Sequence, residues 1–234
     1  NIYYMKNHSF VLEILLFSLI SMFFIIPPLF VDGQFVQKID FTLFSLENLS
    51  HFLLAIFLVY FYRNYFKSNI INLSFILKNF LFLVFSLFFV VITSNIVNLI
   101  AESFYNVENF IVSNSVFVNK PINFFDYLIS IFNLIFAAFF EETIYRFYIP
   151  VFLTSCLILN NPKIQGIPKL IFRILIELFV LLIFAFSHRY LGIFSVINAA
   201  IAHLIFRLTL IFTNNIFTST TAHFIYNFYS LLYY

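Results

Sequence analysis

Long apolar runs separated by short polar stretches dominate this sequence. Most of the runs approach the roughly 20 apolar residues that a helix needs to cross a membrane. The sequence therefore predicts an all-α, polytopic membrane helix bundle with about eight membrane segments, three of them within residues 1–122. The expected segments are residues 10–26, 43–62, 77–100, 123–146, 147–159, 170–186, 191–212 and 217–232.

The fifth segment, 147–159, is expected to be a short return because two rules conflict there. A single crossing over residues 123–160 puts Lys163, Lys169 and Arg173 on the cytoplasmic side, as the positive-inside rule prefers. It also carries His188 to the opposite face from Glu141, which lies about 27 Å along its helix. We therefore expect the chain to turn back after residue 147, at the cost of a basic loop on the disfavoured side.

Composition supports the membrane assignment and limits the partners. The chain of 234 residues is 63% hydrophobic and 9% charged, with a mean hydropathy of +1.02. Soluble domains carry roughly a quarter charged residues, so a soluble protein is excluded. We expect a multi-pass integral membrane protein surrounded by lipid, in the cell membrane if the source is bacterial. The formal charge of +2 is too small to indicate a nucleic-acid partner.

Two adjacent glutamates and an arginine interrupt one of the most apolar stretches, residues 139–146. Charges inside a membrane span persist mainly where they face protein or a wet cavity. On a helix, Glu142 and Arg146 are four apart and share a face, whereas Glu141 points about 100° away. We expect Arg146 to neutralise Glu142. Glu141 then has no partner nearby in the sequence and is available to a water molecule, as a general base must be.

Histidines follow the acidic pair on two further expected helices. His188 ends the run 184–188, and His223 and Asn227 are four apart, so they share one face of the last helix. A carboxylate that deprotonates water and donors that stabilise an oxyanion are the parts needed to hydrolyse an amide. The pattern therefore favours a hydrolytic site gathered from three helices.

The order Glu-Glu-x-x-x-Arg, Phe-x-x-x-His and His-x-x-x-Asn resembles the CPBP intramembrane proteases. That family includes the CAAX-prenyl endopeptidases and bacterial proteins linked to bacteriocin processing, self-immunity and abortive infection. The three motifs here are residues 141–146, 184–188 and 223–227. The resemblance covers residues 123–234, which would form a CPBP-like catalytic core within the same bundle; the first three spans match only as generic membrane helices.

The resemblance implies a role for each motif residue. Glu141 would activate water with the assistance of His188, while His223 and Asn227 would stabilise the tetrahedral oxyanion. Glu142 and Arg146 would form a buried structural ion pair. No cofactor is required in this interpretation, although zinc held by Glu141, His188 and His223 stays open as an alternative. The implied substrate is a peptide or lipidated protein at the membrane, CAAX-like or a bacteriocin or peptide precursor.

Two other functions remain open at this point. The first alternative is a non-enzymatic immunity or partner-binding protein with the family fold. The second is a small ion-coupled transporter that uses Glu141 and the histidines as a relay. His203 and Arg207 belong to no motif, so we interpret them as structural. The position of Glu177 inside an apolar run has no explanation from the sequence.

Overall fold

The computed structural model describes residues 10–31, 38–66, 73–105, 117–159 and 165–233, and these are almost entirely helical. The α-helices are α1 (Phe10–Ile20), α2 (Ile26–Phe30), α3 (Leu46–Phe61), α4 (Leu73–Tyr105), α5 (Phe124–Glu141), α6 (Ile149–Thr154), α7 (Gly166–Phe186), α8 (Ile193–Thr213) and α9 (Ile216–Tyr233). The π-helical segments are η2 (Ser21–Ile25), η4 (Glu142–Tyr148) and η5 (Ser155–Leu159), and the 3₁₀ turns are η3 (Arg63–Phe66) and η6 (Arg189–Leu191). Two short strands, β1 (Lys38–Asp40) and β2 (Phe117–Asn119), pair in parallel.

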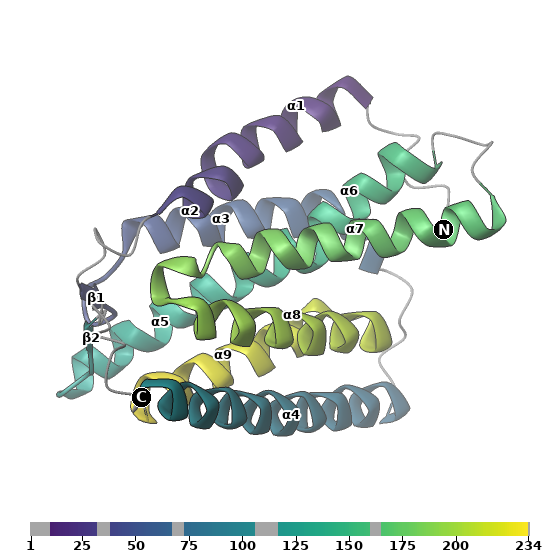
Figure 1. The fold of residues 1–234 in the computed structure, drawn as a ribbon. Coiled ribbons are helices and arrows are strands. Elements are labelled where there is room, and N and C mark those ends of the chain that lie inside the picture. The colour runs from purple at the N-terminus through teal and green to yellow at the C-terminus, as the bar shows by residue number, and fades with distance from the viewer. Residues whose placement is uncertain (1–9, 32–37, 67–72, 106–116, 160–164, 234) are drawn as a thin grey trace.

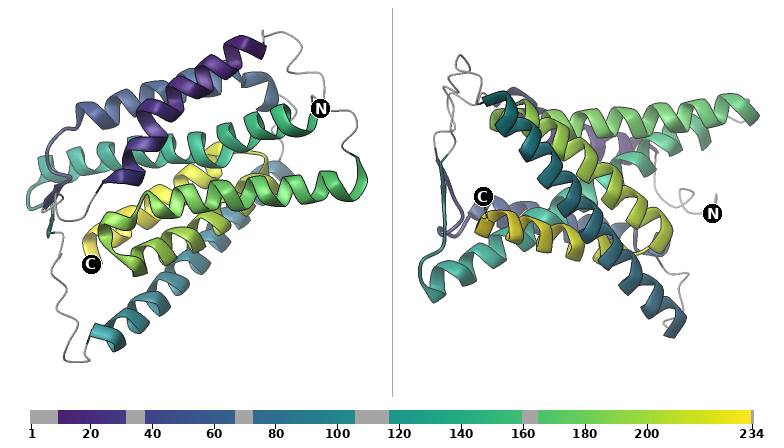
Figure 2. Two further views of the ribbon diagram at one scale, coloured as in Figure 1. Left: turned by 45° about the horizontal axis from the view of Figure 1, so that its top comes forward. Right: turned by 60° about the horizontal axis from the view of Figure 1, so that its bottom comes forward.

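The helices form one elongated bundle (Figures 1 and 2). Helix α1 covers one side of the bundle beside α3 and α6, and α4 covers the opposite side beside α8 and α9. Helix α5 runs through the middle, with α3 and α9 packed on it. The acidic motif at its end is therefore enclosed by helices from both halves of the chain.

Four of the described helical stretches are long and apolar enough to cross a membrane: Phe10–Phe30, Leu73–Phe104, Phe124–Leu157 and Ile193–Thr213. Large apolar side chains also lie exposed over much of the bundle surface, where lipid would cover them. The protein is an all-helical integral membrane protein. The expected number of about eight membrane segments is not confirmed.

The expected return at 147–159 is wrong. Helix α5 continues through η4 and α6 as one helical stretch of 34 residues, Phe124–Leu157. At 1.5 Å per residue this stretch is roughly 51 Å long, so Glu141 lies near its midpoint rather than near one face of the membrane. The depth argument that favoured a return placed Glu141 near one face of the membrane, and this placement is wrong.

Prolines do not end these helices because each lies just after a π-helical segment. Pro150 occupies the first turn of α6 after η4, and Pro27 and Pro28 occupy the first turn of α2 after η2. A proline lacks the backbone N–H, and this loss is tolerated in the first turn of a helical segment. The first helical stretch consequently continues to Phe30 instead of stopping at residue 26.

The continuous helix removes the conflict between the charge rule and the convergence of polar groups. The end of α3, the start of α4 and the start of α7 lie at the same end of the bundle (Figure 1). These segments carry Arg63, Lys78, Lys169 and Arg173. The positive-inside rule therefore assigns this end, which we call the basic end, to the cytoplasmic side.

Polar side chains attach the start of α3 to α5. The Asn133 amide donates to the carbonyl oxygens of Phe41 and Leu43 at 2.9 and 2.8 Å, and its oxygen accepts from the Ser45 N–H at 3.2 Å. Asn123 and Asp126 cap the start of α5 reciprocally. These contacts set α3 beside α5, where Phe52 stacks on Phe136.

Candidate active site

The acidic motif lies where α5 passes into the π-helical segment η4. Glu142 and Arg146 are fully buried, and Arg146 Nη1 lies 2.8 Å from Glu142 Oε1. The contact is an ion pair rather than an aligned hydrogen bond. Two charges without contact to water are tolerated only when they are paired, so these side chains depend on each other.

Aromatic rings enclose the guanidinium of Arg146. Its Cζ lies 4.4 Å from the centre of the Phe184 ring in α7 and 5.3 Å from that of Phe206 in α8. A cation over an aromatic face gains from about 0.5 to about 2 kcal/mol, with the larger value in a desolvated site. The charge is therefore stabilised by rings from two helices, α7 and α8, as well as by Glu142.

His223 of α9 bridges the two adjacent glutamates. Its Nδ1 lies 2.9 Å from Glu142 Oε1, and its Nε2 lies 3.7 Å from Glu141 Oε2. Because a carboxylate oxygen accepts, Nδ1 carries the hydrogen and donates it to Glu142. This bond orients the ring so that Nε2 faces Glu141.

Glu141 differs sharply from its neighbour. Its side chain is 23% exposed, whereas that of Glu142 is 0% exposed. Its Oε2 is buried, and no hydrogen-bond partner for this atom exists among the residues that the structure describes. Glu141 is thus the accessible carboxylate of the pair.

His188 follows the end of α7 and reaches the motif through Phe184. Its Nδ1 lies 2.9 Å from the Phe184 carbonyl oxygen, so this nitrogen carries the hydrogen and the neutral ring has its lone pair on Nε2. The Phe184 ring contacts both His188 and Tyr145. In the following turn, burial and then the negative charge of Glu141 raise the pKa of Tyr190 to about 12, which places this turn near Glu141.

Asn227 is less closely tied to the cluster. It is half-buried on α9, one turn beyond His223, and its side chain makes no hydrogen bond to another residue of the described ranges. The preceding Tyr226 is buried instead: its hydroxyl donates to Ser94 Oγ at 3.0 Å and accepts from the Asn198 amide at 2.6 Å. The structure therefore groups Glu141, Glu142, Arg146 and His223, places His188 behind Phe184, and leaves Asn227 at the margin.

A second ion pair adjoins the motif, and the sequence analysis did not find it. Arg207 of α8 binds both carboxylate oxygens of Glu177 in α7, at 2.9 and 2.5 Å. Its Nη1 donates to the carbonyl oxygen of Arg146 at 2.7 Å. The ion pair with Arg207 explains the position of Glu177 inside an apolar helix. The sequence carried a signal for this pair, because two consecutive apolar helices each contain a charge and the two charges are opposite.

His203 is buried beside this second pair. Its ring lies against Phe184, and neither ring nitrogen has a hydrogen-bond partner within the described part of the chain. Together with Glu177 and Arg207 it lines a cavity of about 250 Å³. The structure gives His203 no hydrogen bond that would support a purely structural role.

The described residues do not bring together the side chains that the zinc alternative requires. Glu141 and His223 approach each other, but no group of three or more His, Cys, Asp or Glu side chains that could hold a metal ion occurs in residues 10–31, 38–66, 73–105, 117–159 and 165–233. Glu141, His188 and His223 do not converge as a metal site in this arrangement.

The site combines an accessible glutamate, a histidine fixed by a second glutamate and a buried arginine inside a membrane bundle, and these are groups that an intramembrane hydrolase can use. A comparison with family models supports this class: residues 123–229 match the model described as type II CAAX prenyl endopeptidase Rce1-like. The match spans just under half of the chain and includes all three motifs. It supports the CPBP resemblance and, with it, a protease of the CPBP type, a peptide hydrolase.

Neither of the other two comparisons adds a relative. The search of curated proteins finds no match, and the search of solved structures finds none. Helices α1 to α4 lie outside the matched residues.

Proposed function

We propose that this protein is an intramembrane endopeptidase that hydrolyses a peptide bond of a membrane-associated substrate, with Glu141 as the base that activates water. The observation that carries the proposal is the asymmetry between the two adjacent glutamates. Glu142 is buried and paired with Arg146 and His223, while Glu141 is partly exposed and lies 3.7 Å from an imidazole nitrogen of His223.

The 3.7 Å separation between His223 Nε2 and Glu141 Oε2 is too long for a direct hydrogen bond, so the imidazole does not occupy the Glu141 carboxylate. The Glu141 side chain is also partly exposed, and we place a water molecule at its accessible part. In the proposed step Glu141 takes a proton from this water while the oxygen attacks the carbonyl carbon. The C–N bond then breaks, and the leaving amine takes the proton that Glu141 removed from the water. His188 would assist Glu141 in activating the water.

The proposed oxyanion stabilisers are His223 and Asn227, both on α9. Nδ1 of His223 is held by Glu142, so a proton on Nε2 would point towards the Glu141 side, where the charge develops. Asn227 would complete the site on the same helix. Glu142 and Arg146 would act by positioning His223 and would not touch the substrate.

The family supports a CAAX-like prenylated protein or a membrane-associated peptide as the substrate class. We propose a lipidated or precursor peptide. If the source is bacterial, the protein would act in the cell membrane.

The test compares Glu141→Gln with Glu102→Gln, an exposed glutamate on α4. A peptide with a prenylated cysteine, incubated with protein in liposomes, reports cleavage by mass spectrometry, and membrane peptides of cells making each variant report natural substrates. We expect Glu141→Gln to lower the rate by about 10²- to 10⁴-fold without a change in thermal unfolding, and Glu102→Gln to be unaffected.

Full cleavage by Glu141→Gln would disprove the assignment of the base. If no variant cleaves, but immunity or partner binding survives Glu141→Gln, the protein is a binding member of its family. Ion-dependent uptake without cleavage would instead indicate the transporter.

A further inference from the structure

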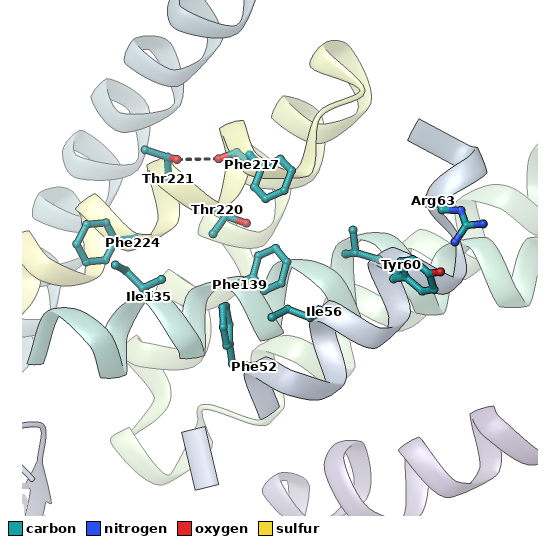
Figure 3. A pocket seen from close by; sticks show the side chains of 11 residues that line it. Phe52, Ile56, Tyr60, Arg63, Ile135, Phe139, Phe217, Thr220, Thr221 and Phe224 are labelled. Atoms are coloured by element: carbon teal, nitrogen blue, oxygen red, sulfur yellow. Dashed lines mark hydrogen bonds between the residues drawn. The ribbon is translucent and has the colours of Figure 1, made fainter. Parts of the chain in front are cut away.

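A long apolar groove lies between α3 and α9 on the outer surface of α5. It has a volume of about 700 Å³. Figure 3 shows Phe52 and Ile56 of α3 beside Phe139 of α5, with Phe217 and Thr220 of α9 across from them. Because α3 belongs to the part of the chain outside the family match, the match does not define this groove.

One end of the groove carries a positive charge. Arg63 and Tyr60 line this end, and the guanidinium carbon lies 4.5 Å from the centre of the Tyr60 ring (Figure 3). Both side chains are exposed, and Arg63 forms no ion pair with a carboxylate of the described ranges. The rest of the lining is apolar apart from two threonines.

The length of the groove corresponds to one leaflet of a bilayer. Phe52 lies on α3 and Arg63 starts the turn η3 that follows it, eleven positions further along the chain, which is roughly 16 Å at 1.5 Å per residue. The hydrocarbon core of a bilayer is about 30 Å thick, so one leaflet, and hence one acyl chain, occupies about 15 Å. The charged end of the groove lies at the basic end of the bundle, which the positive-inside rule assigns to the cytoplasm.

We propose that this groove is a binding site for an anionic phospholipid. One acyl chain lies between α3 and α9 on α5, and the phosphate lies against Arg63. Anionic lipids are concentrated in the cytoplasmic leaflet, where a basic side chain gains about a fivefold preference for them. This site is separate from the proposed hydrolysis, and its test needs no substrate.

The experiment measures lipid binding to the purified protein by native mass spectrometry. The probes are phosphatidylglycerol and phosphatidylcholine with identical acyl chains. We expect phosphatidylglycerol to bind about fivefold more tightly, Arg63→Gln to abolish this preference and Arg63→Lys to retain it. Lys78→Gln removes a charge from the same end but outside the groove, and it should leave the preference unchanged.

A second pair of variants tests the acyl chain. Ile56→Trp fills the groove at a partly exposed position and should weaken the binding of both lipids, whereas Leu77→Trp on α4 should not. Equal affinity for the two lipids, or an Ile56→Trp variant that binds them normally, would overturn the proposal.

Two other occupants would also contradict it. If Ile56→Trp weakens binding of a prenylated peptide but not of phosphatidylglycerol, the groove holds the lipid of a substrate. If it instead dissociates a dimer of the lipid-free protein, the groove holds a second copy of the chain.

Discussion

The two ion pairs near the acidic motif differ in origin and in burial. Glu142 and Arg146 are four residues apart in one helix, and both side chains are 0% exposed. Glu177 and Arg207 come from α7 and α8, and their side chains are 40% and 18% exposed. Water and lipid headgroups therefore cannot reach the Glu142–Arg146 pair, whereas they can contact the partly exposed Glu177–Arg207 pair.

The two ion pairs are connected through the backbone of Arg146. We call Glu142–Arg146 the inner pair and Glu177–Arg207 the outer pair. Arg207 donates to the carbonyl oxygen of Arg146, so the outer pair supports the backbone that carries the inner pair. The inner pair in turn orients His223 through Glu142. Burial increases towards the motif, and the cost of breaking a contact should increase in the same direction.

The largest effect is expected for Arg146→Leu. This change leaves the Glu142 carboxylate buried without its cation, which costs about 3–5 kcal/mol of unfolding free energy. Unfolding in detergent micelles by titration with a denaturing detergent measures it.

The double variant Glu142→Met with Arg146→Leu is the control for that prediction. Replacing a buried pair by apolar side chains is often neutral, so the double variant should be more stable than Arg146→Leu alone. If the single variant is as stable as the wild type, the inner pair does not support the fold.

A smaller effect is expected for Glu177→Gln. The neutral amide still accepts hydrogen bonds from Arg207, but the charge of Arg207 loses its partner, at a cost of about 1–3 kcal/mol. The same unfolding assay measures it, with Glu102→Gln as the matched control. A loss equal to that of Arg146→Leu would remove the distinction between the two pairs.

The smallest effect is expected for Phe184→Leu, which removes the ring nearest to the Arg146 guanidinium. The loss of this cation–π contact should cost about 1–2 kcal/mol. Phe179→Leu, on the exposed face of the same helix, should cost less. Equal losses in the two variants would show that Arg146 gains nothing from the ring.

The sequence was informative where contacts are local. The spacing of Glu142 and Arg146 places them on one helical face whatever surrounds them. The apolar runs predict helices in a membrane for the same reason. The sequence analysis failed over residues 147–159 because it inferred a return from the need to bring the polar groups together, whereas the helix continues past Pro150 through η4 and α6.

The sequence by itself determined the class of the protein: an all-helical membrane protein with an acidic pair and two histidine motifs in order. The tertiary structure decided which glutamate is accessible, that His223 stands between both, that Arg207 reaches the backbone of Arg146, and that α3 and α9 leave a groove on α5. The physical reason is the range of the interactions. Hydrophobicity and helical periodicity act within a few residues, whereas burial and pairing depend on side chains that are distant in the sequence and meet only when the helices pack.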